Sequence, residues 1–107
     1  MDIKMYYIYM LRCMDESIYT GITTDVDRRM NEHFSKDEKC AKYTFRHTAK
    51  KLERVFQTET RADASKLEYH IKHLTKSQKE DIIKNAKKLS YLKEKLDTKK
   101  YKVYKIK

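Results

Sequence analysis

The sequence predicts an α+β domain in which helices flank a small three-stranded antiparallel sheet. Two runs rich in Tyr, Ile and Met, residues 5–13 and 17–22, lie on either side of a short polar stretch, as in a β-hairpin. A third strand is expected at residues 52–58, and stretches with apolar residues at helical spacing follow the hairpin and this strand. Elements of these kinds combine as helices packed on a sheet.

The first helix is expected at residues 25–34, directly after the hairpin. Thr24 is the expected N-cap, and Asp27 in the first turn favours the positive end of the helix. The expected buried stripe consists of Val26, Met30 and Phe34. Residues 35–46 are expected to form a charged loop that leads into the third strand.

Two more helices are expected after the third strand. Thr60 caps the first of them, and the capping box TKSQ that begins at Thr75 opens the second. The apolar stripe of the first consists of Ala64, Leu67, Ile71 and Leu74. We therefore assign residues 1–85 to one domain.

The lysine-rich residues 86–107 are expected to be a C-terminal extension, helical and then extended, that packs on the same domain. The leucines that would cover the core are Leu89, Leu92 and Leu96. Tyr101, Val103 and Lys105 alternate poorly, which indicates at most a short terminal strand.

Charge points to a polyanionic partner. The 107 residues include 26 Lys and Arg against 16 Asp and Glu, a net charge of +10. Nucleic acid is the first expectation and an anionic membrane the second, while a basic surface that serves only solubility is the alternative. No membrane span or export signal is expected, because the most apolar run, residues 5–11, is too short to cross a bilayer.

Cysteine usage agrees with a cytoplasmic protein. Cys13 and Cys40 form no CxxC pair, so reduced thiols are expected and a zinc site is not. His70 and His73 are three residues apart on a helix, but no third strong ligand is nearby in the sequence. The sequence gives no sign of a required protein partner.

Two tyrosines of the hairpin are the first candidates for catalysis. If the turn centres near Asp15, Tyr9 and Tyr19 are diagonal neighbours on one face of the sheet. The alternative is that both rings serve packing alone, because tyrosine is common in half-buried strands.

The first predicted helix carries the second pair of candidates. Arg29 and His33 are four residues apart and border the apolar stripe, whereas Arg28 and Glu32 lie nearly opposite it. Arginine suits bidentate contact with phosphate. The alternative for Arg29 is a side chain that only covers the edge of the core.

Glu68 is the most informative carboxylate. It lies next to the buried stripe of its helix, where a negative charge needs a cation. A magnesium-class ion suits this position, since such ions often take one or two protein carboxylates plus substrate phosphate. A structural salt bridge to Arg or Lys is the alternative.

The ordered motifs resemble the GIY-YIG nuclease superfamily, in particular its short, single-domain bacterial branch with a URI-type endonuclease-like domain. They are Tyr-Ile-Tyr at residues 7–9, IYTGITTDVDRR at 18–29, His33, AKYT at 41–44 and LEYHIKHLT at 67–75. The match covers about the first four-fifths of the chain. The first half-motif lacks its glycine here, and residues 36–40 are charged where relatives tend to have glycines.

The resemblance implies a metal-dependent endonuclease that hydrolyses phosphodiester bonds, with DNA expected before RNA. Glu68 matches the metal ligand, for Mg²⁺ or Mn²⁺, and Arg29 the arginine that stabilises negative charge on the phosphoryl group. Tyr9 or Tyr19 would orient or deprotonate the attacking water, and His33 is a second candidate for proton transfer. Because free tyrosine has a pKa near 10, a base role requires a cationic neighbour to lower it.

The same resemblance marks residues expected to contact nucleic acid. Gly21 matches the glycine that lets backbone and substrate approach. Lys42 is expected to bind nucleic acid and is also a candidate for the cation beside the tyrosines, while Tyr43 and Arg46 are expected to touch the backbone or a splayed base. The main alternative to an enzyme is a module of the same fold that binds nucleic acid without cutting it.

Overall fold

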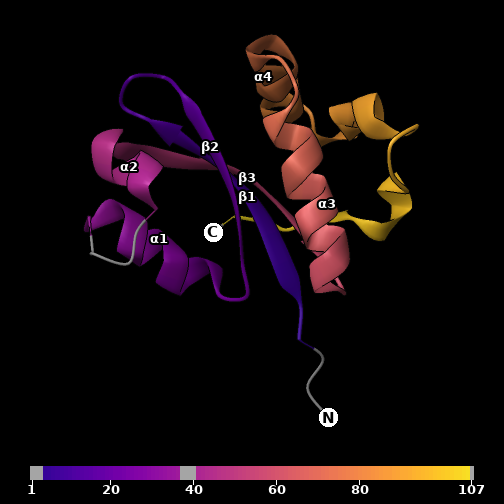
Figure 1. The fold of residues 1–107 in the computed structure, drawn as a ribbon, viewed down its shortest axis with the longest axis horizontal. Coiled ribbons are helices and arrows are strands. Elements are labelled where there is room, and N and C mark those ends of the chain that lie inside the picture. Colours follow the sequence, from indigo (N-terminus) through magenta and orange to yellow (C-terminus); the bar gives the residue numbers. More distant parts are fainter. Residues whose placement is uncertain (1–3, 37–40, 107) are drawn as a thin grey trace.

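An antiparallel sheet of four strands forms the centre of the computed structural model, which describes residues 4–36 and 41–106. The strand order is β2-β1-β3-β4 (Figure 1). The strands are β1 (Tyr6–Cys13), β2 (Ile18–Thr23), β3 (Ala49–Thr58) and β4 (Lys102–Val103). The predicted α+β class is confirmed, but the sheet has one strand more than the three expected, because the short terminal segment pairs with β3.

Helices cover both faces of the sheet. On one face lie α1 (Val26–Phe34) and α2 (Lys42–Arg46), as Figure 1 shows. On the other lie α3 (Arg61–Lys72), α4 (Lys76–Lys84) and the 3-10 helices η1 (Ala86–Leu92) and η2 (Thr98–Lys100). Alternate residues of each strand point to opposite faces. The sheet therefore contributes to two separate apolar clusters, one under each group of helices.

The buried stripe of α1 differs from the predicted one. Val26 and Met30 are buried as expected, but Phe34 is 46% exposed and His33 is fully buried in its place. The two spacings, seven and eight residues, fit a helix almost equally well, so periodicity could not separate them. The predicted cap is also wrong, since Asp25 and not Thr24 accepts the hydrogen bond from the N–H of Arg28.

A short helix replaces part of the expected loop. Residues 42–46 form α2, whose N-cap Ala41 makes no side-chain hydrogen bond. Neither a capping residue nor a long apolar period therefore marked this helix in the sequence. Strand β3 also begins three residues earlier than expected, because Ala49 and Lys51 pair with the end of β1.

The predicted starts of α3 and α4 are confirmed. The Thr60 side chain accepts a hydrogen bond from the N–H of Asp63. Thr75 and Gln78 form the reciprocal capping box. In α3 the predicted stripe is buried at Ala64, Leu67 and Ile71, with Leu74 partly buried.

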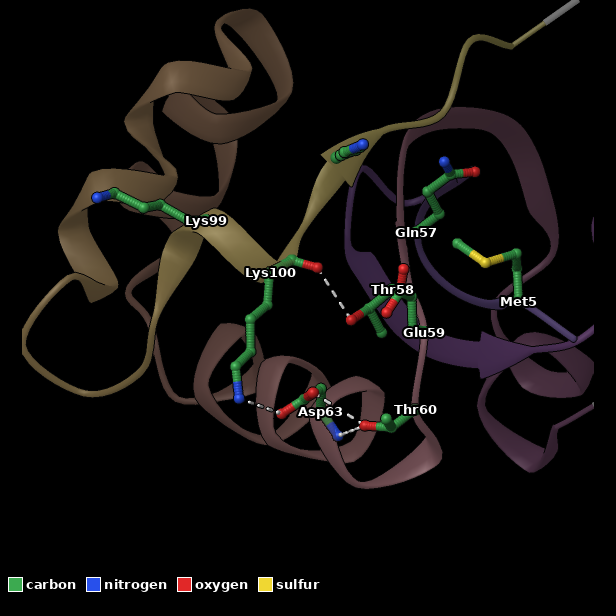
Figure 2. Close-up of a pocket in the computed structure, with 9 residues that line it drawn as sticks. Met5, Gln57, Thr58, Glu59, Thr60, Asp63, Lys99 and Lys100 are labelled. Carbon is green, nitrogen blue, oxygen red and sulfur yellow. Dashed lines mark hydrogen bonds and ion pairs between the residues drawn. The ribbon is translucent and has the colours of Figure 1, made fainter. Parts of the chain in front are cut away.

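Apolar contacts, a hydrogen bond and an ion pair join the C-terminal segment to the rest of the domain. Leu89 and Leu92 are buried in the cluster under α3, and Leu96 packs against it. Near the start of α3, the Thr58 hydroxyl donates to the Lys100 carbonyl at 3.0 Å, and the Lys100 ammonium lies 3.8 Å from the Asp63 carboxylate (Figure 2). These contacts line a pocket of about 410 Å³ that contains none of the residues predicted for catalysis.

The end of the segment reaches the opposite face of the sheet. The N–H of Tyr104 donates to the Val55 carbonyl at 2.8 Å, and its ring meets Tyr7 edge-on at 4.8 Å. Tyr104 thereby joins the cluster under α1. One continuous segment, residues 86–104, therefore touches both apolar clusters.

In the described part of the chain, no helix is both long and apolar enough to cross a membrane. Cys13 is buried with a free thiol, and Cys40 lies outside the described residues.

Candidate active site

Tyr9 and Tyr19 occupy the diagonal positions predicted for them on β1 and β2. Tyr9 pairs with Gly21 and Leu11 with Tyr19, so both tyrosines face α1. Their ring centroids are 6.1 Å apart. Tyr9 is almost fully buried and Tyr19 is half-buried. Only the second ring is therefore open to solvent to a useful degree.

Gly21 makes room for the Tyr9 ring. A Cβ at this position would lie 2.4 Å from the Tyr9 hydroxyl oxygen, 2.6 Å from Cζ and 3.0 Å from the Tyr19 ring. The glycine thus has a role inside the site. The approach of nucleic acid at this residue stays a prediction.

Gly21→Ala is expected to displace the Tyr9 hydroxyl and to reduce cleavage together with stability. Forcing a methyl group against a buried ring costs about 1–3 kcal/mol. Thermal melting and cleavage rate, measured on the same preparation, test this expectation. An alanine variant with the melting temperature and rate of the wild type would contradict the assigned role.

A chain of hydrogen bonds connects Tyr9 to the backbone of the segment before α2. The Tyr9 hydroxyl lies 2.7 Å from Nε2 of His33, and Nδ1 of His33 lies 2.6 Å from the Thr44 hydroxyl. The Thr44 hydroxyl donates to the Ala41 carbonyl at 3.1 Å. Its proton is committed there, so Nδ1 carries the imidazole proton and Nε2 accepts from Tyr9. His33 is therefore held as a neutral acceptor aimed at the tyrosine.

Burial controls the protonation of this chain. It raises the pKa of Tyr9 well above the ordinary range, although the hydrogen bond from Arg29 acts in the opposite direction. It also raises the pKa of Tyr19. Burial, followed by the charge of Arg29, lowers the pKa of His33 to about 4. Arg29 acts on both tyrosines in the direction that a base role requires, but desolvation outweighs it, so the pKa of each tyrosine is raised.

Neutral His33 makes stability depend on pH. The unfolded chain binds a proton at an ordinary pKa of 6.5 and the folded chain only near 4. The contribution of neutral His33 to the free energy of unfolding is thus complete above pH 6.5 and is lost as the pH falls toward 4. It amounts to about 3 kcal/mol for a shift of this size. Arg29 and Glu32 are the charged groups that act on the ring.

We expect His33→Gln to flatten the change in unfolding free energy between pH 7 and pH 5, measured by urea titration. His73→Gln, which removes an exposed imidazole from α3, is the matched control. Equal pH dependence in the wild type and His33→Gln would contradict the buried neutral histidine.

Arg29 lies between Tyr9 and Glu32. Its Nε donates to the Tyr9 oxygen at 3.4 Å, and its Nη1 binds the Glu32 carboxylate at 2.8 Å. The Glu32 side chain is only 15% exposed, so the expectation that it points into solvent is wrong. The ion pair fixes the guanidinium beside the tyrosine hydroxyl. From there the guanidinium can donate hydrogen bonds to a phosphate oxygen.

Glu68 reaches the same site from α3. Burial is the main cause of the raised pKa of Tyr9 and Tyr19, and the charge of Glu68 adds to it in the same direction. Its side chain is 24% exposed, and it pairs with Lys72 at 3.6 Å. Lys72 also stands 5.7 Å above the Tyr19 ring. The salt bridge considered from the sequence therefore exists, but its lysine is exposed and only one helical turn away, so it holds the carboxylate weakly.

Glu68 is the predicted metal ligand, and its carboxylate is the group that could hold an ion here. No cluster of three His, Cys, Asp or Glu side chains occurs within residues 4–36 and 41–106. A magnesium-class ion often keeps its waters and takes one or two protein carboxylates with a substrate phosphate, so the binding of such an ion by Glu68 stays a prediction.

An aromatic row extends the site toward α2. Tyr43 stacks on Tyr19 at 5.6 Å, and His47 stacks on Tyr43 at 4.3 Å. His47 is bound by Asp15 at 2.5 Å. Hydrogen bonds from Ser17 and then His47 lower the pKa of Asp15 to about 2. The row, Tyr19, Tyr43 and His47, is thus held in place from the turn of the hairpin.

Two predicted nucleic-acid contacts lie next to this row. Lys42 and Arg46 are both exposed on α2. Their binding of nucleic acid, like that of Tyr43, stays a prediction.

Comparison with known proteins agrees with this geometry. The model of the family described as the GIY-YIG catalytic domain matches residues 5–81, which include both tyrosines, Arg29, His33 and Glu68. The chain belongs to this family. A UPF0213 protein of Fusobacterium nucleatum is 46% identical over 101 residues, covering 94% of this chain and 97% of the relative. A UPF0213 protein of Halobacterium salinarum is 41% identical over 78 residues, covering 73% of this chain and 99% of the relative.

A solved relative is the UPF0213 protein BH0048 from Bacillus halodurans, determined by solution NMR. It is 30% identical, and the alignment covers 82% of this chain and 96% of that chain with a TM-score of 0.48.

Two residues of the GIY-YIG site were missed in the sequence. Thr44 is fully buried and orients His33, but a threonine in an unpredicted helix gives no local signal of this role. Lys72 lies four residues after Glu68. This spacing on a helix was the one indication in the sequence that the two side chains meet.

Proposed function

We propose that the protein is a metal-dependent endonuclease that hydrolyses phosphodiester bonds, with DNA preferred to RNA. The observation that carries the proposal is the hydrogen-bonded set of Tyr9, Arg29 and neutral His33, beside which Glu68 pairs with the Lys72 that lies over the Tyr19 ring. The nuclease-type family and the net charge of +10 support a nucleic-acid substrate. The preference for DNA rests on the resemblance in the motifs.

The hydrogen-bond chain gives a route for the proton of the attacking water. The water oxygen bonds to phosphorus while its proton passes to the Tyr19 oxygen, which is open to solvent; the Tyr19 proton passes to Tyr9, and the Tyr9 proton to Nε2 of His33. Tyr9 therefore relays a proton without a lasting tyrosinate, which its raised pKa disfavours. Thr44 keeps the imidazole in the accepting tautomer.

The remaining groups handle the charge of the phosphate. Arg29 donates to a non-bridging oxygen as negative charge increases in the transition state. The bond to the leaving oxygen breaks, and this alkoxide takes a proton from solvent. His33, whose lowered pKa favours the neutral ring, then returns its proton to solvent. Glu68 would hold Mg²⁺ or Mn²⁺, and the chemistry that such an ion supplies is neutralisation of the phosphate and the leaving alkoxide.

A cleavage assay tests the proposal. Labelled single-stranded DNA, duplex DNA and RNA are each incubated with pure protein in Mg²⁺, Mn²⁺ or EDTA. Cleavage with either ion and none in EDTA is the expected result. The ion pair of Glu68 with Lys72 favours the alternative, a module that binds without cutting. Failure to cut any of the three substrates with either ion would select that alternative.

A further inference from the structure

A hollow of about 330 Å³ adjoins the active site on the far side of Arg29. It lies where the end of β2, the first turns of α1 and the start of α3 meet, and Figure 1 shows these segments at one end of the sheet. The polar side chains that line it are Thr23, Thr24, Arg28, Arg29, Glu32 and Arg61. Its size is at the lower end of the range of ligand pockets.

The charges of the hollow favour an anion. Three arginines face one carboxylate, that of Glu32, and Arg29 already binds this carboxylate at 2.8 Å. Arg28 and Arg61 are exposed, and neither guanidinium has an ion pair or hydrogen bond to any residue that the structure describes. Two arginines that bind nothing within the described fold add little to its stability. Phosphate suits them, because two of its oxygens can accept the paired N–H groups of a planar guanidinium.

The hollow lies beside the proposed cleavage site, at a position that suits another phosphate of the same nucleic-acid strand. It begins at Ile22, the residue after Gly21 on β2, and shares Arg29 with the site. The predicted contacts Lys42 and Arg46 lie on α2, beyond the other end of the nine-residue helix α1. A helix of that length spans about 13 Å at 1.5 Å per residue. Neighbouring phosphates of a B-DNA strand rise by about 3.4 Å, so the helix spans several of them.

We propose that the hollow binds a backbone phosphate that flanks the scissile phosphate, held by Arg28 and Arg61. This inference rests on the proposed function, since it takes Arg29 to mark the scissile position. It deepens that function by defining the substrate as a polymer that continues past the site on the α3 side. A phosphodiester without a neighbouring phosphate has no group to place in the hollow, so the hollow adds nothing to its binding affinity.

The test compares two double variants that lose the same charge. Arg28→Ala/Arg61→Ala removes two cations from the hollow, and Lys93→Ala/Lys95→Ala removes two from an exposed part of the C-terminal segment. Binding of fluorescein-labelled single-stranded and duplex DNA is measured in EDTA at several salt concentrations. We expect the arginine variant to bind about tenfold more weakly and to lower the salt slope by about one to two, with a change under about twofold in the lysine variant.

A second measurement uses a small substrate. Bis-p-nitrophenyl phosphate is a diester with no flanking phosphate, so its hydrolysis by the arginine variant is expected to equal that by the wild type. DNA cleavage by the same variant is expected to show a raised KM. Melting curves of all variants establish that each is folded.

The outcomes separate this inference from the proposed function. Equal weakening by both double variants, or a wild type that binds no DNA, would overturn the flanking-phosphate site. Cleavage of DNA by the arginine variant with the KM of the wild type would overturn it too, while leaving the nuclease proposal intact. A wild type that binds DNA through Arg28 and Arg61 but cuts nothing supports the site and refutes the nuclease.

Discussion

Glu68→Gln is expected to abolish cleavage while the fold and nucleic-acid binding persist. Glutamine keeps the shape of the side chain but removes the charge on which a metal ion depends. Loss of several kcal/mol of charge stabilisation corresponds to a rate lower by roughly three orders of magnitude. Binding in EDTA is expected to equal or exceed that of the wild type, because a negative charge facing the phosphates has gone.

Stability distinguishes this role from a structural one. Lys72 is exposed and pairs with the partly buried Glu68 one helical turn away, so loss of this pair is expected to cost only about 0.3–0.5 kcal/mol. Glu94→Gln makes the same chemical change at an exposed position of the C-terminal segment and serves as the control. Gels, melting curves and binding titrations are run side by side. Folded Glu68→Gln that cuts at the rate of the wild type would refute the metal-ligand assignment.

Arg29→Ala is expected to slow cleavage about a hundredfold and to weaken binding much less, because a donor to the transition state is lost. Measured separately, kcat falls while KM changes little. Arg29→Lys is expected to recover part of the rate, since the charge returns without the planar fork.

The partner of Arg29 needs its own control. Removal of the guanidinium leaves the half-buried Glu32 carboxylate unpaired, which is costly in itself. Arg29→Ala/Glu32→Gln removes this cost, and its rate is expected to stay as low as that of Arg29→Ala. Recovery of activity in the double variant, or an equal loss in binding and rate, would show that Arg29 serves structure or anchoring and not the transition state.

Local chemistry accounts for the features that could be predicted from sequence. The starts of α3 and α4 follow from cap residues within one turn, and the diagonal of Tyr9 and Tyr19 follows from the hairpin register. The catalytic residue types and their order came from the resemblance. Their convergence could be expected only once the family was recognised.

The features that could not be predicted from the sequence depend on tertiary contacts. His33 is buried because Tyr9 and Thr44 provide partners for both ring nitrogens, and those partners come from other elements. Helix α2 is stabilised by its packing beside Tyr19 and has no cap of its own. Burial of polar side chains such as His33, which sets the direction of the pKa shifts, is not marked by apolar periodicity.

The residues proposed for catalysis occupy a shorter stretch of the chain than the residues that build the fold, and the C-terminal segment is the difference. The family match ends at residue 81, yet Leu89, Leu92 and Tyr101 complete one apolar cluster and Tyr104 packs on the other. A shorter chain ending at residue 85 would contain every residue assigned to chemistry while exposing apolar surface on both sides of the sheet. Mutations in this segment that never touch the substrate therefore act through the amount of folded protein, and their effects on activity disappear when rates are divided by the folded fraction.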